Sequence, residues 1–102
     1  MIESTILETT EPNAKAVTAT VVLAAIADPI RWNVVQHLAQ GRSCVCELQE
    51  IVPIAGNLLS YHLRILREAG LVVAKPRGRW VDYELASDAE AKLRAALPLR
   101  TH

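Results

Sequence analysis

Two cysteines separated by one residue, Cys44 and Cys46, carry the most distinctive chemistry in this chain. Two thiolates this close can chelate one thiophilic ion, such as arsenite, antimonite, cadmium, lead, zinc or copper(I). On an ideal α-helix, residues i and i+2 point about 200° apart, so one ion can bridge both sulfurs only where the first helical turn is unwound or has not yet begun. We expect Ser43 to cap a helix here, which places the pair at a helix N-terminus, where thiol pKa values are lowered.

The same two cysteines allow two further interpretations. A cysteine often serves as a small buried apolar side chain, and two neighbouring thiols can also form a disulfide that responds to redox conditions. The chain has no third cysteine. An ion that prefers three or four ligands would therefore need donors from solvent, from a histidine or from N-terminal carboxylates such as Glu3 and Glu8.

Positive charge is concentrated in residues 57–80, although the formal net charge of all 102 residues is zero. Residues 1–13 contain three glutamates and no Lys or Arg. The segment 57–80 contains five basic residues and one acidic residue, Glu68. A basic segment on a neutral chain is compatible with contacts to phosphates.

A predicted helix at about residues 57–69 has two chemically different faces. Leu59, Leu63 and Leu66 recur at helical spacing and are expected in the core. The other face carries side chains that suit a DNA groove: Asn can read adenine, Arg can read guanine or clamp phosphate, and Ser or Tyr can bind phosphate. An exposed Leu near the helix start could touch a thymine methyl. The predicted DNA-reading residues are Asn57, Leu58, Ser60, Tyr61 and Arg64.

A polar helical face alone does not distinguish DNA binding from simple solvation, but the segment that follows favours DNA. Residues 71–75 and 80–85 have the composition and alternation of β-strands, and residues 76–79 form a turn with proline and glycine. Arg77 and Arg79 flank Gly78 at the tip of this hairpin. We expect both arginines to find their partner outside the domain, in a minor groove or along a phosphate backbone.

The remaining elements are helices that place this hairpin behind a helix-turn-helix unit. We predict helices at about 14–27, 29–40, 46–52 and 89–97, with Asp28 and Pro29 starting the second, and Ser87 or Asp88 capping the last. The order is α-α-α-α-β-β-α, a mainly helical fold with one hairpin. Residues 1–13 are predicted to be a loose arm, 14–97 one domain for DNA binding and dimerisation, and 98–102 a tail.

Several classes of protein do not fit the sequence. It lacks an apolar stretch of membrane-spanning length and a recognisable signal peptide, so we expect a cytoplasmic protein that has no membrane partner. There are no carboxylates paired at a useful spacing, no Cys–His pair with an orienting group and no phosphate-cradling loop, so we do not expect an enzyme.

Residues 59–72 and 78–85 resemble the ArsR/SmtB family of metal-sensing transcriptional repressors, as do the shorter segments 27–31 and 44–48. The resemblance covers about residues 20–86. It implies a homodimer built on the first and last helices, which binds an inverted-repeat DNA operator and leaves it when an inducer binds. By position, Ser60 and His62 match the family motif in the recognition helix, and Gly78 and Arg79 match the wing.

Three positions depart from the family pattern. Ala55 stands where a Ser or Thr cap is usual, so Asn57 is an alternative cap. Gln49 stands where the family's arsenic sensors often carry a third cysteine, which disfavours arsenite and leaves room for zinc, cadmium or nickel. His62 lies beside core leucines, and we expect it to be packed and hydrogen-bonded.

Further acidic and histidine side chains are candidate ligands. Some family members bind metal on the last helix, where Asp88, Glu90 and the terminal His102 form a second candidate set. Their spacing matches poorly, and we favour a solvated acidic cap with a flexible tail. His37 is expected to be structural or at the surface.

The sequence is compatible with three functional hypotheses. The first is a metal- or metalloid-responsive repressor. The second is a winged-helix regulator that responds to redox, through a Cys44–Cys46 disulfide, or to an additional protein partner. The third is a protein–protein module without a DNA role, which the arginine-bearing hairpin tip disfavours.

Overall fold

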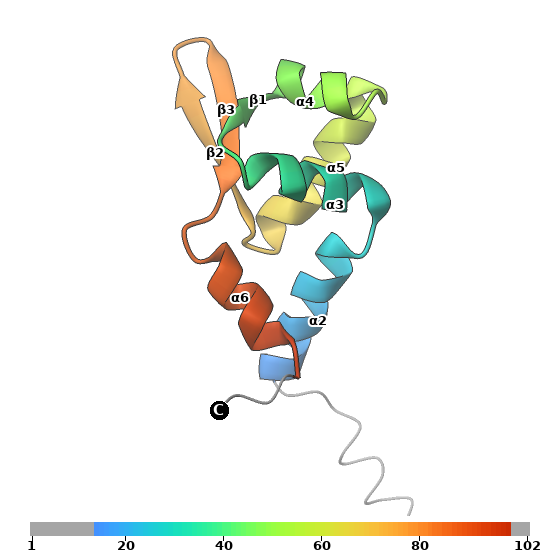
Figure 1. Ribbon diagram of the computed structural model, residues 1–102, viewed down its shortest axis with the longest axis vertical. Coiled ribbons are helices and arrows are strands. Elements are labelled where there is room, and N and C mark those ends of the chain that lie inside the picture. Colours follow the sequence, from blue (N-terminus) through green and yellow to red (C-terminus); the bar gives the residue numbers. More distant parts are fainter. Residues whose placement is uncertain (1–13, 99–102) are drawn as a thin grey trace, which may run out of the picture.

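Residues 14–98 of the computed structural model fold into a winged helix-turn-helix (Figure 1). The predicted order of elements is confirmed, with one additional short strand. The predicted arm, residues 1–13, and residues 99–102 of the predicted tail lie outside the described residues. The elements are α2 (Ala14–Ile26), α3 (Pro29–Leu38), β1 (Ser43–Cys44), α4 (Val45–Ile51), α5 (Gly56–Glu68), β2 (Val72–Arg77), β3 (Trp80–Leu85) and α6 (Ala89–Ala96).

Helix α3 begins as the sequence predicts. The Asp28 carboxylate accepts hydrogen bonds from the backbone N–H groups of Ile30 (2.9 Å) and Arg31 (3.0 Å), and Pro29 occupies the first helical position. These bonds satisfy two donors that lack a partner inside the helix, and Pro29 has no N–H to satisfy. The start of α3 is therefore set by residues 28 and 29 alone.

The core lies between the helices and the inner face of the sheet. Leu59, Leu63 and Leu66 of α5 are fully buried, as predicted, and they pack in the same cluster as Leu48 of α4 and Val34 of α3. Helices α2 and α6 pack against each other at the end of the molecule opposite the tip of the hairpin (Figure 1). Helices α3, α4 and α5 and the α2–α6 pair thus share one core.

The sheet has the order β1-β3-β2, and both pairings are antiparallel. Strand β1 was not predicted, because two residues are too few to show an alternating pattern. In the β1–β3 ladder Cys44 lies opposite Asp82. The wing, β2 and β3 with their turn, closes between Arg77 and Trp80. Gly78 has φ +62° in this turn, a left-handed conformation that glycine adopts without steric cost.

No helix within residues 14–98 is both long enough and apolar enough to cross a membrane.

Candidate nucleic-acid interface and cysteine pair

The exposed face of α5 carries the side chains predicted for a DNA-reading helix. Leu58 and Tyr61 are 42% and 47% exposed, and Asn57, Ser60 and Arg64 are also exposed. Arg67, which was not predicted for this face, is exposed on it as well, and the spacing 57, 60, 64, 67 is that of a helical stripe. This face has a hollow of about 280 Å³, which is lined by Asn57, Ser60, Tyr61, Arg64 and Arg67.

The start of α5 leaves Asn57 available for a ligand. The N-cap residue is Ala55, which has no side-chain acceptor, and its backbone carbonyl accepts from the N–H groups of Leu58 and Leu59. The alternative in which Asn57 caps the helix is therefore wrong: Asn57 lies inside the first turn, after Gly56, and not at the cap position.

His62 does not belong to the exposed face. It is 7% exposed, and its Nδ1 lies 2.9 Å from Nη1 of Arg31. Because a guanidinium has donors only, Nδ1 is the acceptor in this bond. The expectation of a packed, hydrogen-bonded histidine is confirmed, whereas a direct DNA contact of this ring, suggested by its motif position, does not fit its burial.

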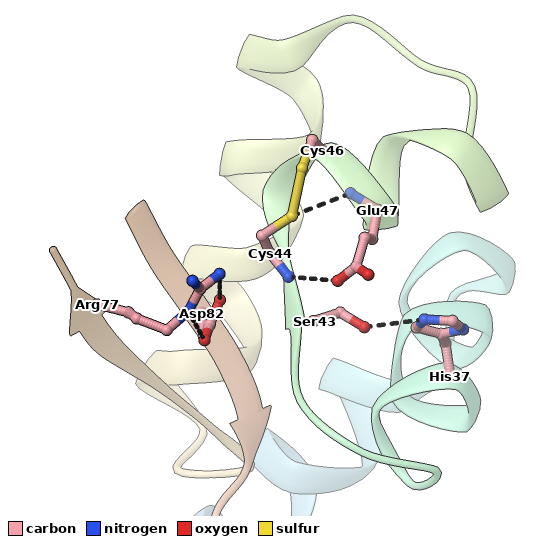
Figure 2. Close-up of a disulfide and its surroundings, with 7 residues drawn as sticks. All are labelled: His37, Ser43, Cys44, Cys46, Glu47, Arg77 and Asp82. Atoms are coloured by element: carbon pink, nitrogen blue, oxygen red, sulfur yellow. Dashed lines mark hydrogen bonds and ion pairs between the residues drawn. A yellow bond between two sulfur atoms is a disulfide. The ribbon is translucent and has the colours of Figure 1, made fainter. Parts of the chain in front are cut away.

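The two wing arginines differ in their surroundings. Arg79 is exposed and makes no hydrogen bond or ion pair within residues 14–98. Arg77 donates to both carboxylate oxygens of Asp82, over 2.7 Å and 3.2 Å (Figure 2). The expectation that Arg77 finds its partner outside the domain is therefore wrong. In the β2–β3 register Asp82 lies directly opposite Lys75. Arg77 follows Lys75 by two residues and lies on the same face, so Arg77 and Asp82 form a diagonal cross-strand pair.

Asp82 is a buried carboxylate at 4% exposure, and Arg42 approaches it as a second cation at 3.9 Å. The hydrogen bonds and charge of the Arg77 guanidinium hold the pKa of Asp82 below its ordinary value. The carboxylate is thus ionised and fully partnered, as a buried charge must be.

The cysteine pair lies at the junction of β1 and α4, the helix start predicted for it. Cys44 is the N-cap residue: its sulfur accepts from the Glu47 N–H (3.4 Å), and the Glu47 carboxylate accepts from the Cys44 N–H (3.0 Å) (Figure 2). The prediction of Ser43 as the cap is wrong by one residue. Ser43 belongs to β1, and its hydroxyl lies 2.9 Å from Nε2 of His37, which gives that histidine the structural role expected for it.

The two sulfurs are joined in a disulfide (Figure 2). Extended backbone at Cys44 (φ −80°, ψ 168°) lets its side chain turn towards that of Cys46 in the first turn of α4. Cys44 is buried and Cys46 is exposed. A small-molecule thiol or an ion can therefore approach the pair from the Cys46 side.

The donors around the pair do not complete a metal site within the described residues. No group of three or more His, Cys, Asp or Glu side chains comes together between residues 14 and 98. The Glu47 carboxylate is engaged in the cap, and the Gln49 side chain donates to the Ile54 carbonyl at 3.3 Å. Glu3 and Glu8 lie outside the described residues. The described part of the chain thus offers an ion two sulfurs.

The second candidate metal set, on the last helix, is engaged in ion pairs. Asp88 lies 3.3 Å from Lys92 and Glu90 lies 2.8 Å from Arg94, both at a spacing of four residues. The Asp88 side chain does not cap the helix. His102 lies outside the described residues. Within residues 14–98, these ion pairs favour the interpretation of Asp88 and Glu90 as a solvated helix end and not as metal ligands.

Comparisons with known proteins agree with this geometry. A family model described as "Bacterial regulatory protein, arsR family" matches residues 28–73. The arsenical resistance operon repressor of Bacillus subtilis (strain 168) is 42% identical over 62 residues, 60% of this chain and 59% of that protein. The biofilm growth-associated repressor of Agrobacterium fabrum is 36% identical over 83 residues, 81% of this chain and 71% of that protein.

Solved structures resemble the chain over a similar span. A possible transcriptional regulator for arsenical resistance is 39% identical, covers 72% of this chain and 77% of its own, and has a TM-score of 0.68. HlyU from Vibrio cholerae N16961 is 27% identical, covers 81% of this chain and 91% of its own, and has a TM-score of 0.72. The chain spans 59%, 57% and 48% of three curated relatives: the Bacillus subtilis repressor, an ArsR of Halobacterium salinarum and SmtB of Mycobacterium tuberculosis.

Proposed function

Because the chain belongs to the ArsR family of bacterial regulatory proteins, we propose that it is a transcriptional repressor that binds double-stranded operator DNA as a homodimer. The family is one of regulatory proteins, in agreement with the expectation that the chain is not an enzyme. The observation that carries the proposal is the division of α5. Leu59, Leu63 and Leu66 are fully buried, while the polar side chains of the opposite face line one open hollow. The wing, with the exposed Arg79, follows α5 directly in the sequence.

The chemistry of this surface suits a DNA duplex. Arg64 and Arg67 can hold phosphates or a guanine edge, and Asn57 can accept and donate to adenine. Arg79, with no partner in residues 14–98, can enter a minor groove or neutralise a phosphate. Arg77, held by Asp82, contributes charge to the wing and not a free contact.

The dimer is proposed to form through α2 and α6, the first and last helices described. Their packing leaves Val21 of α2 46% exposed and Leu97, at the end of α6, 42% exposed. Between the helices runs a small apolar hollow of about 100 Å³. Exposed apolar side chains beside a groove of small residues suit a second copy of the same surface. Two recognition helices would then read an inverted repeat, with half-sites about 34–36 Å apart.

The inducer is proposed to be a thiophilic metal or metalloid bound by the thiolates of Cys44 and Cys46, with operator release as the result. Two relatives are named as arsenical resistance repressors, in Bacillus subtilis and Escherichia coli, and a third as SmtB. Zinc, cadmium, nickel or arsenite would take its remaining ligands from outside residues 14–98. Because Cys44 caps α4, and Gln49 of α4 holds the turn before α5, a change at the cap reaches the recognition helix.

Metal titration of the reduced protein tests this assignment. We expect a thiolate-to-metal absorption band in the ultraviolet that is absent from the variant Cys44→Ser/Cys46→Ser, and metal-dependent loss of operator binding in a gel shift. If each ion leaves both the spectrum and the gel shift of the reduced protein unchanged, the metal assignment is refuted.

Redox control is a second candidate, and the joined sulfurs favour it specifically. A small-molecule disulfide can oxidise the pair: the two cysteine thiols give up two electrons and two protons, and the small disulfide leaves as two thiols. Here the test compares operator affinity of oxidised and reduced protein without metal. Equal affinities in the two states would exclude redox control and leave the metal assignment standing.

A further inference from the structure

A single buried carboxylate, that of Asp82, connects the cysteine pair to the wing. Cys44 of β1 lies directly opposite Asp82 of β3, and Asp82 holds Arg77 of β2 by two hydrogen bonds. Figure 2 shows the Arg77–Asp82 pair beside the strand that carries Cys44. We infer that Asp82 is a positioning residue that transmits the state of Cys44 and Cys46 to the DNA-binding wing. This inference rests on the proposed function in so far as the wing contacts DNA.

The register of the sheet places Cys44 and Asp82 next to each other on one face. Residues directly opposite on antiparallel strands have Cβ atoms about 4.5–5.5 Å apart and project from the same face. Cys44 and Asp82 are such a pair in one ladder, and Lys75 and Asp82 are such a pair in the other. Arg77, two residues after Lys75, also points to this face. No intervening side chain is needed between Cys44 and the carboxylate that holds the wing arginine.

Two arginines, one before the cysteine pair in the sequence and one after it, balance the negative charge of Asp82. Arg77 reaches Asp82 from the wing, and Arg42 reaches it from the segment that leads into β1. The Asp82 side chain is 6% exposed, so its charge depends on these two cations. A displacement of β1 changes the positions of Arg42 and Cys44 relative to Asp82, and the ion pair between Arg77 and Asp82 must then adjust.

Strand β1 is well suited to move with the cysteines. It has two residues, so few ladder hydrogen bonds hold it to β3. The disulfide ties Cys44 to the first turn of α4 and restrains the joint between β1 and that helix. Reduction by a dithiol adds two electrons and two protons to the bond, which yields two thiols while the dithiol becomes a cyclic disulfide. Only the cap hydrogen bonds between Cys44 and Glu47 then hold the joint, and β1 can shift against Asp82.

Tryptophan fluorescence reports this movement without DNA. The chain has two tryptophans, and Trp80 lies opposite Arg77 in the wing and is 59% exposed. In a Trp32→Phe background, we expect the Trp80 emission maximum to differ between the oxidised protein and the protein reduced with dithiothreitol. Adding Asp82→Asn is expected to abolish the difference. Arg77→Gln, which removes the other partner, is expected to do the same and carries the test if Asp82→Asn does not fold by circular dichroism.

Glu84→Gln is the matched control. Glu84 lies on the same strand and pairs with Lys75 of β2 at 3.1 Å, but it does not face Cys44 in the register, so the emission difference should persist. Cys44→Ser/Cys46→Ser should show no response to dithiothreitol. The inference is overturned if the parent shows no difference, or if the difference survives in folded Asp82→Asn or Arg77→Gln. The fluorescence experiment contains no DNA. If the parent protein failed to bind operator DNA in a separate gel shift, the proposed function would be refuted, but the fluorescence result would stand.

Discussion

Arg31 and His62, which are separated by 31 positions in the chain, meet at 2.9 Å and join three helices. Arg31 belongs to α3 and His62 to the recognition helix α5, while Nε of Arg31 donates to the Ala25 carbonyl of α2 at 2.7 Å. The helix proposed for dimer contact is thus tied to the helix proposed for DNA contact through one guanidinium.

Removing His62 should destabilise the fold. His62→Ala leaves the Arg31 guanidinium without its buried acceptor and opens space beside core leucines, so we expect the free energy of unfolding to fall by about 1–3 kcal/mol. Urea denaturation followed by circular dichroism measures the change. The exposed Arg64→Ala is the control and should change stability by less than about 0.5 kcal/mol. Equal stability of His62→Ala and the parent would contradict a structural role for this ring.

Asp28 should give the protein a pH-dependent stability. The backbone N–H of Arg31 and, after it, the Arg31 charge hold the pKa of Asp28 below its ordinary value, despite some opposition from burial. Such a group stabilises the fold above the ordinary aspartate pKa, about 4, and this contribution is lost as pH falls through the lowered pKa.

The variant Asp28→Asn isolates this charge, because Asn keeps an acceptor for the helix cap. Thermal midpoints measured from pH 6 down to pH 2 should differ between parent and variant at the upper end and converge at the lower end. A constant difference across the range would show that the charge of Asp28 is not responsible.

Arg79 should contribute to DNA binding through charge. Arg79→Ala is expected to weaken operator binding and to reduce the slope of log K against log salt by about 0.9, the value for one phosphate contact. Fluorescence anisotropy at several salt concentrations measures the slope. The control is Arg94→Ala on α6, where the arginine pairs with Glu90, and its slope should match the parent. If both variants reduce the slope equally, the prediction that Arg79 contacts a phosphate is contradicted.

Val21 should support the dimer. Val21→Glu puts a charge on the exposed apolar face of α2, and we expect a monomer in sedimentation experiments with an unchanged helical signal. Val81→Glu, on a β3 residue that is 39% exposed, is the control and should remain dimeric. A dimeric Val21→Glu protein would place the subunit contact elsewhere.

Cys44→Ser should preserve the helix cap. Serine is a favourable N-cap residue, and its hydroxyl can accept from the Glu47 N–H in place of sulfur. We therefore expect the thermal midpoint of Cys44→Ser/Cys46→Ser to be at least that of the reduced parent. Cys44→Ala removes the acceptor and should cost about 0.5–2 kcal/mol relative to Ser. A serine variant that is less stable than the alanine variant would contradict the cap assignment.

Local spacing was enough to predict much of this molecule. The two faces of α5 follow from the 3.6-residue period, the start of α3 from Asp28 and Pro29, and the wing from an alternating run beside a Pro-Gly turn. Helix geometry allows one ion to bridge Cys44 and Cys46 only at a helix start, and the structure places the pair there. Each of these inferences concerns residues close in sequence, where bond geometry and periodicity constrain the outcome.

Partnerships between distant segments could not be read in this way. Strand β1 exists only because Ser43 and Cys44 pair with residues of β3 about 40 positions later, and the partner of His62 comes from another helix. Even Arg77 and Asp82, five residues apart, required the strand register before their pairing could be recognised. Which polar groups are buried together depends on how the elements pack, and the energy of a buried charge forces those pairings only after packing has removed water.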